Sequence, residues 1–178
     1  PRIYINSFLR GGPRWRYSEE NFGFLFTGTD QRKKFSTVAG YVHSQAKQAN
    51  FGLRRYELRF RYQPLNALSL SLDTRFEQSP NKTQYVSQQD FNGTTRYITG
   101  EIDQETISAT LRVNYTINPN LTIQYYGQPF ISRGRYSNFN FVTNPVAKDL
   151  DDRVRLYNEQ QISFNEADPI AQVQFFLI

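Results

Sequence analysis

The residues of this chain that could do chemistry are mainly its clustered carboxylates. Glu101, Asp103 and Glu105 alternate along a predicted strand, so they share one face. Such groups could act as the acid and base of glycoside hydrolysis if they were held at a defined separation across a sugar. Same-face like charges are explained more simply if they line water or pair with arginines such as Arg112. We therefore predict no catalytic residues here and no enzyme activity.

Metal and nucleophile chemistry has little support in the sequence. Asp149, Asp151 and Asp152 could offer oxygen ligands to calcium, but the twelve-residue loop pattern with its glycine and distal glutamate is missing, which favours a solvated acidic loop. His43 is the single histidine and there is no cysteine, so histidine metal centres and thiolate sites are not expected. No HExxH, GxSxG or phosphate-binding glycine loop occurs. We expect neither a metal nor a cofactor.

The elements that position these groups are predicted strands, because apolar and polar residues alternate through residues 56–62, 68–77 and 111–125. Successive side chains of a strand point to opposite faces, so each segment has an apolar and a polar face. The side chains that we predict to face lipid are Tyr56, Leu58, Phe60, Tyr62, Leu68, Leu70, Leu72, Leu111, Val113, Tyr115, Leu121 and Ile123. The side chains that we predict to line an aqueous lumen are Arg55, Glu57, Arg59, Arg61, Asp73, Arg75, Arg112, Asn114 and Gln124.

Composition favours a membrane β-barrel over a soluble domain. Hydrophobic residues make up only 38% of the 178 residues, yet 16% are aromatic, with 15 Phe and 12 Tyr. In a barrel only alternate residues face lipid and aromatic rings gather at both interfaces, which reconciles the two values. No run approaches the ~20 apolar residues that a membrane helix needs. Many of the basic residues behind the net charge of +5 alternate along strands, so no nucleic-acid partner is expected.

Period-two runs bounded by turn residues predict eight or nine strands within a single domain, residues 1–178, and no helix. The predicted strands are residues 2–9, 15–27, 34–43, 53–63, 67–78, 104–117, 120–131, 153–164 and 170–178. Short links at residues 30–33, 64–66 and 118–120 alternate with longer polar links at 44–52, 79–103 and 132–152. This alternation is typical of outer-membrane barrels. Pro129 predicts a bulge or a strand end.

A repeat at a spacing of 53 residues relates residues 58–72 to residues 111–125. Both copies contain Leu, Arg, an apolar residue, a polar residue and Tyr, followed by a Pro/Asn turn and renewed alternation. The pairs predicted next to the two turns are Tyr62 with Leu68 and Tyr115 with Leu121. The repeat therefore predicts two hairpins built to one plan.

Charges of both signs lie close together on the polar face of the first hairpin. The predicted register places Glu57 diagonal to Arg75 and Arg59 diagonal to Asp73, within reach of long side chains. Inside a barrel such charges would satisfy one another, whereas isolated charges would be costly. A solvated face of a soluble antiparallel sheet would show the same pattern.

Short motifs in residues 10–145 resemble one known family. They are GGPR at 11–14, TDQRKK at 29–34, DQETIS at 103–108, NPNL at 118–121, QPF at 128–130 and GRYSNF at 134–139. In that order they resemble the C-terminal outer-membrane barrel domain of unknown function of Bacteroidetes proteins that carry an N-terminal carbohydrate-binding, family-nine-like domain. The resemblance implies an outer-membrane location and a barrel larger than these strands alone can close. It implies no reaction, because no activity is established for that family.

We therefore predict an all-β fold, an antiparallel up-and-down transmembrane β-barrel or a part of a larger one, in the bacterial outer membrane. The expected role is a pore or a scaffold, including an accessory role in a larger outer-membrane complex, with lipid and other outer-membrane proteins as partners. One alternative is a soluble β-barrel that binds an apolar or carbohydrate ligand. Another is a carbohydrate-active hydrolase, which only the resemblance suggests. Because the sequence begins at Pro1 without a leader, we expect a processed chain or a piece of a longer one.

Overall fold

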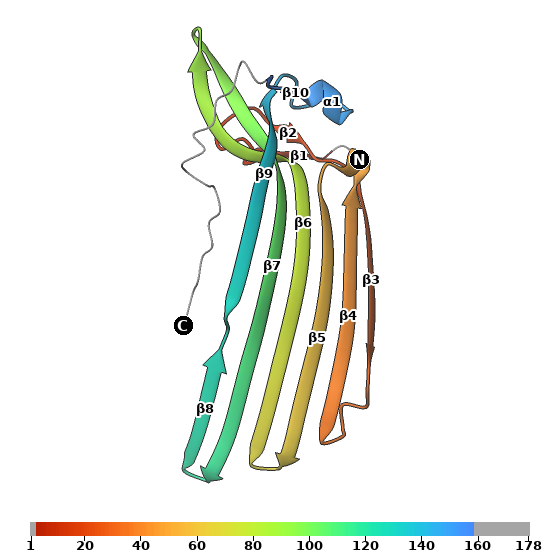
Figure 1. Ribbon diagram of the computed structural model, residues 1–178, viewed down its shortest axis with the longest axis vertical. Helices are drawn as coiled ribbons and strands as arrows, with labels where there is room; N and C mark the ends of the chain where they lie inside the picture. Colours follow the sequence, from red (N-terminus) through yellow and green to blue (C-terminus); the bar gives the residue numbers. More distant parts are fainter. Residues whose placement is uncertain (1–2, 159–178) are drawn as a thin grey trace.

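A single curved antiparallel sheet dominates the computed structural model, which describes residues 3–158 (Figure 1). Its strands are β3 (Glu20–Gly28), β4 (Phe35–Ala46), β5 (Gly52–Leu65), β6 (Leu68–Phe91), β7 (Thr94–Asn118), β8 (Leu121–Gly127), β9 (Phe130–Val142) and β10 (Val154–Leu156). Their order in the sheet is β10-β9-β7-β6-β5-β4-β3, and β8 also pairs with β7. A small separate ribbon joins β1 (Tyr4–Ile5) to β2 (Trp15–Arg16), and two short helices, η1 (Lys47–Ala49) and α1 (Leu150–Arg153), lie in connections.

The predicted all-β class with antiparallel, up-and-down neighbours is confirmed, but a closed barrel is not formed by residues 3–158. The sheet ends at β3 on one side and at β8 and β9 on the other, with β10 beside the last part of β9. All residues of β3 are exposed, as are nearly all of β8. The described chain is therefore an open, curved sheet with two long edges.

Residues 79–103, predicted as a loop, form a hairpin instead. β6 and β7 continue through this region and pair as far as Phe91 with Thr94. The two residues between them, Asn92 and Gly93, have φ angles of 49° and 76°. Positive φ at both central residues defines the type I′ turn, which Asn-Gly favours because its twist matches that of the flanking strands. The loop was predicted because the flanking residues are polar and do not alternate.

Several other strand boundaries were predicted wrongly. Of the predicted strand 2–9, the described residues 3–9 contain only the two-residue β1, and residues 15–27 are divided between β2 and β3. β9 covers residues 132–142 of the predicted loop 132–152. The short helix α1 follows it, so the expectation of no helix was also wrong. Of the predicted strand 153–164, β10 covers Val154–Leu156, and the part beyond residue 158 lies outside the described residues. The predicted strand 170–178 lies outside them as well.

The predicted alternation of short and long links was wrong at the upper end of the sheet, because a turn of only two residues, Asn92 and Gly93, joins β6 to β7 there (Figure 1). Turns β3–β4, β5–β6 and β7–β8 lie at the lower end, while η1, the extended β6–β7 hairpin and α1 lie at the upper end. The predicted interruption at Pro129, in contrast, is confirmed. β8 ends at Gly127 and β9 begins at Phe130, and both pair with β7 along the same edge.

The predicted hairpin registers were wrong by two residues in both copies of the repeat. Observed pairs are Tyr62 with Leu70 and Tyr115 with Ile123. The pairs that close the turns are Leu65 with Leu68 and Asn118 with Leu121, each after a register shift. These positions differ by the repeat spacing of 53 residues, so the two turns follow one plan. A slip of two residues leaves every side chain on its predicted face.

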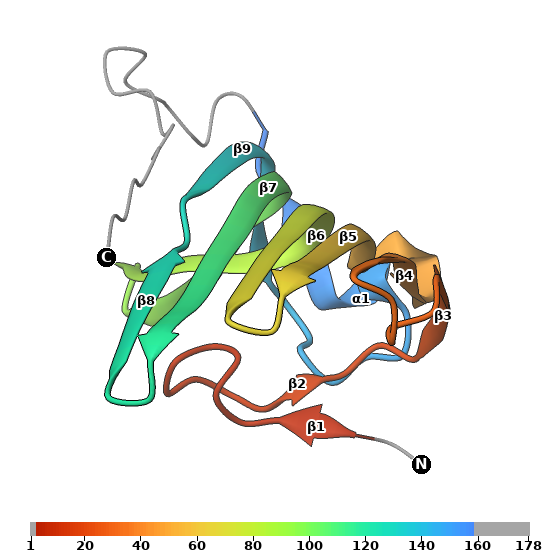
Figure 2. The same ribbon diagram turned by 90° about the horizontal axis from the view of Figure 1, so that it is seen from below.

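Most of the buried core lies at the upper end, where the N-terminal segment crosses the concave side of the sheet (Figure 2). Leu9 and Trp15 are fully or almost fully buried, and Phe8 stacks on Trp15 at 4.6 Å between ring centroids. Hydrogen bonds join Asn50 to Ser18 and Thr83 to Asn50 at 3.1 and 2.8 Å. This packing anchors the N-terminal segment to the base of the β6–β7 hairpin and creates the cavity described below.

Candidate functional site: a charged sheet face and a cavity at its end

The nine side chains predicted to line a lumen all lie on one face of strands β5 to β8. Residues paired across a ladder share a face, and the ladder rows join Arg59, Asp73 and Thr110, then Arg61, Ser71 and Arg112. The row of Asn114 and Gln124 continues the same face onto β8. Whether this face meets water in a lumen stays a prediction.

Ion pairs cross the charged face directly rather than diagonally, which corrects the predicted arrangement. Arg59 Nε lies 2.6 Å from Asp73 Oδ1, and Arg55 Nε lies 2.8 Å from Glu77 Oε2. Glu57 accepts two cations, with Oε1 3.5 Å from Arg75 Nε and 3.8 Å from Arg55 Nη1. Its side chain is only 19% exposed, so solvent screens these contacts less than it screens surface pairs.

Positive charge remains in excess on the charged face. Five arginines, at positions 55, 59, 61, 75 and 112, face three carboxylates, at positions 57, 73 and 77, which leaves two positive charges. Arg61 and Arg112 flank Ser71, and the Arg112 guanidinium lies 5.3 Å from the centre of the Tyr126 ring. A hollow of about 90 Å³ lies between Phe26 and the Glu57–Arg75 pair. This face therefore offers paired charges with a net attraction for anions.

The twelve side chains predicted to face lipid lie on the opposite face, and no described element covers them. Leu58, Leu111 and Ile123 are 45%, 40% and 53% exposed. On β7 the apolar positions run from Ile107 to Ile117, about 33 Å along the strand and about 25 Å along the normal at a tilt of ~40°. That height matches the apolar band of an outer-membrane barrel. No described helix is long and apolar enough to cross a membrane.

The three alternating carboxylates of β7 lie where this apolar band ends. Glu105 pairs in the ladder with Arg133 and Asp103 with Arg135, so their cationic neighbours come from β9. Arg112 lies on the other face, and the prediction that it partners them was wrong. Glu105 accepts a hydrogen bond from the Gln78 amide at 3.1 Å. Asp103 and Glu105 line a hollow of about 230 Å³ together with Arg133 and Arg135.

The other candidate ligands are dispersed. Asp151 and Asp152 lie in the first turn of α1, and Asp149 accepts a hydrogen bond from Gln48 at 3.4 Å. His43 stacks on Tyr41 at 6.3 Å, and its Nδ1 is buried without a hydrogen bond. Within residues 3–158 no group of three or more His, Asp or Glu is placed to hold a metal ion.

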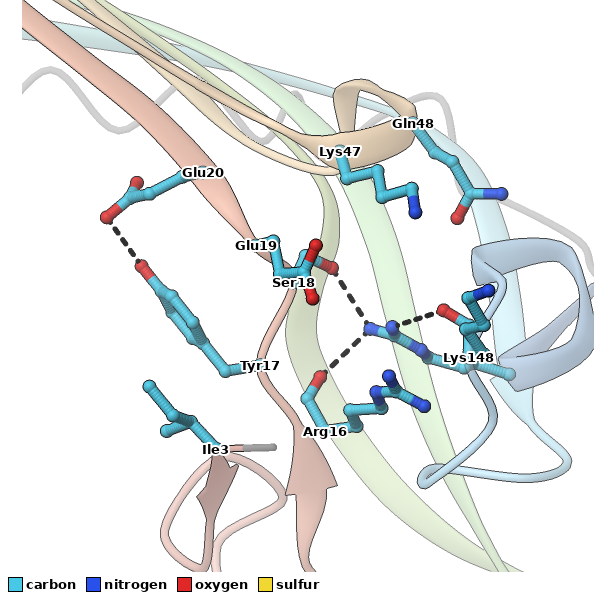
Figure 3. Close-up of a pocket in the computed structure, with 10 residues that line it drawn as sticks. Ile3, Arg16, Tyr17, Ser18, Glu19, Glu20, Lys47, Gln48 and Lys148 are labelled. Atoms are coloured by element: carbon cyan, nitrogen blue, oxygen red, sulfur yellow. Dashed lines mark hydrogen bonds between the residues drawn. The ribbon is translucent and has the colours of Figure 1, made fainter. Parts of the chain in front are cut away.

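A cavity of about 390 Å³ lies at the upper end, where three distant segments meet (Figure 3). Its walls come from the N-terminal strand region, η1 and the loop before α1, and they consist of Ile3, Arg16, Tyr17, Ser18, Glu19, Glu20, Lys47, Gln48, Lys148 and Arg153. The sequence patterns did not predict this cavity. Arg153 and Arg16, which are joined by a hydrogen bond here, lie 137 residues apart in the sequence, and no local motif marks them.

Arg153 organises the cavity wall. The residue is 2% exposed, and its guanidinium donates to the carbonyls of Ala147, Arg16 and Lys148, each at 2.9 Å, and to Ser18 Oγ at 3.1 Å. Burial lowers the pKa of Arg153, and the nearby charge of Arg16 lowers it further, while Asp149 opposes the shift. The guanidinium therefore joins residues 16–18 to the loop before α1 through neutral acceptors.

Tyr17 and Glu20 form the opposite wall. The Tyr17 hydroxyl donates to Glu20 Oε1 at 3.0 Å, and Ser44 Oγ donates to Glu20 Oε2 at 3.3 Å. Partial burial raises the pKa of Tyr17, and the hydrogen bond to Glu20 and its charge act in the same direction. The phenol thus stays protonated and keeps Glu20 engaged.

From β5 to β8 the antiparallel sheet is amphipathic, with an exposed apolar side and an ion-paired polar side, and on β3 the exposed rings of Phe22, Phe24 and Phe26 lie on the polar side. The chain belongs to the family described as Domain of unknown function (DUF5916), whose model matches residues 10–168. The match extends past residue 145, where the resemblance noted in the sequence ended. No curated protein and no solved structure matches this chain.

Proposed function

We propose that this chain is part of an outer-membrane β-barrel that serves as a pore or as a scaffold. The observation that carries the proposal is the uncovered apolar face, about 25 Å high, behind a face of paired charges. Hydrocarbon would cover the first face and water the second. A soluble barrel would instead need its apolar side chains packed inward, whereas Leu58 and Leu111 are exposed here.

The open edges support a barrel with more strands than the described sheet contains. Edge strands leave backbone groups unpaired, and membrane spans require those groups to be paired because lipid offers no hydrogen bonds. We therefore expect further strands to pair with β3 and with the edge formed by β8 and β9. Those strands would come from a longer chain or from another protein of an outer-membrane complex.

We propose no enzymatic role, and we carry the family's carbohydrate-linked context only as a hypothesis. The alternating carboxylates of β7 lie beside arginines of β9 at the edge of the apolar band, and the hollow of about 230 Å³ that Asp103 and Glu105 line there has both arginines, Arg133 and Arg135, in its wall. Replacing Glu105 with Gln in the full-length protein should leave any sugar-cleaving activity unchanged.

Extraction and conductance test the proposal. The full-length protein should need detergent for solubility and should change its gel mobility on heating, as barrels do. A pore should conduct in a planar bilayer, with anions passing more readily than cations because the described wall carries two excess positive charges. A silent barrel would leave the scaffold role, and a monomer soluble without detergent would refute membrane insertion.

A further inference from the structure

We propose that the cavity at the upper end of the sheet binds the phosphate or carboxylate group of a small solute. The site lies outside the apolar and charged faces on which the membrane role rests. Its walls belong to residues 16–20, η1 and the loop before α1. The binding proposal can therefore be tested whether or not the sheet crosses a bilayer.

Cations outnumber available anions around this cavity. Arg16, Lys47, Lys148 and Arg153 line it together with two glutamates, Glu19 and Glu20. Glu20 is already engaged by two hydroxyl donors, those of Tyr17 and Ser44. Among the described residues, none of the four cations forms an ion pair within 4 Å.

The buried guanidinium gives the site a fixed positive wall. All acceptors of Arg153 are neutral carbonyls or a hydroxyl, so its hydrogen bonds hold it in place without cancelling its charge. Arg16 lies close enough to act on it as a like charge. Two guanidiniums near each other favour an anion that both can approach.

The Lys47 and Arg16 side chains enter the cavity from opposite sides and can contact a ligand directly (Figure 3). A cavity of about 390 Å³ is larger than an inorganic ion and lies in the range of small-molecule sites. Tyr17 and Ile3 offer an apolar wall for the body of such a molecule. The geometry thus points to an anionic solute of roughly monosaccharide size.

Calorimetry with the full-length protein tests the site, with glucose 6-phosphate and glucuronate as anionic probes and glucose as a neutral one. At least one anionic probe should bind and glucose should not. Lys47→Gln and Arg16→Gln should each weaken binding about tenfold, the loss expected for one charge-assisted hydrogen bond. Lys33→Gln, in the turn at the far end of the sheet, is the matched control and should leave affinity unchanged.

A second arm separates a soluble ligand from a lipid headgroup. Vesicles of phosphatidylglycerol and of phosphatidylcholine are compared, with inorganic phosphate as competitor. Binding to the anionic vesicles that Lys47→Gln weakens and phosphate displaces would assign the anion to a lipid. The proposal is overturned if neither anionic sugars nor anionic vesicles bind. It is overturned equally if Lys33→Gln weakens binding as much as Lys47→Gln, since that would reflect overall charge.

Discussion

Arginine placed at different depths of the apolar face should reveal which solvent covers it. Leu111 lies near the middle of the band that runs from Ile107 to Ile117 on β7, and its ladder partner is Leu72. An arginine at bilayer mid-depth costs about 2 to 4 kcal/mol. Leu111→Arg should therefore lower the folding equilibrium constant by about 30- to 700-fold. Urea unfolding from phospholipid vesicles measures this free energy.

Two control variants make the test specific. Ile117 lies at the end of the band, where an arginine should lower the free energy of unfolding by only about 0 to 1 kcal/mol. Its side chain is about as exposed as that of Leu111, at 47% against 40%, so exposure alone would not explain a difference between the two variants. Thr110→Arg lies next to Leu111 on the charged face, opposite Asp73, and should cost less than about 1 kcal/mol. Ser71 is a poorer control because its ladder neighbours are Arg61 and Arg112. Equal losses at positions 111 and 117 would refute the assignment of this face to lipid.

Three further predictions concern the packing of the sheet and its upper end. Glu57→Gln should lower the free energy of unfolding by about 1 to 3 kcal/mol, because two arginines lose a partly buried partner; an unchanged urea midpoint would contradict this. Arg153→Lys should cost about 3 kcal/mol or more, because three carbonyls in two chain segments lose donors, and amide exchange of residues 3–18 should accelerate. Gly40→Ala should cost about 1 to 3 kcal/mol, because a Cβ at Gly40 would come within 2.3 Å of the Phe26 ring; Gly23→Ala, where nothing lies within 4 Å, is its control.

The face on which each side chain lies could be predicted from sequence, because it depends only on whether the residue's position along its strand is odd or even. Arg59 and Leu58 point oppositely in any register of their strand, so alternation alone assigns their sides. The register could not be predicted to the residue, because the irregular step between Tyr62 and Leu65 depends on turn geometry. That step moved every predicted pair by two positions without exchanging faces.

Two other features were missed for different physical reasons. The upper β6–β7 hairpin lacks alternation because it extends beyond the main sheet, and its Asn92-Gly93 turn was the signal that could have identified it. The cavity around Arg153 depends on contacts between segments more than 100 residues apart, and a single sequence carries no local pattern for such contacts. Whether the sheet closes with further strands depends on partners that alternation does not specify.

The matching turns of β5–β6 and β7–β8 have a consequence for how such a sheet can change size. The first strand of each hairpin begins, and its second strand ends, at the same end of the sheet. Gaining or losing a whole hairpin therefore preserves the direction of every remaining strand and the orientation of both faces (Figure 1). A single added strand would instead reverse the polarity of everything after it. Homologous chains with different strand numbers should therefore differ by multiples of two, with copies of this turn at the points of insertion.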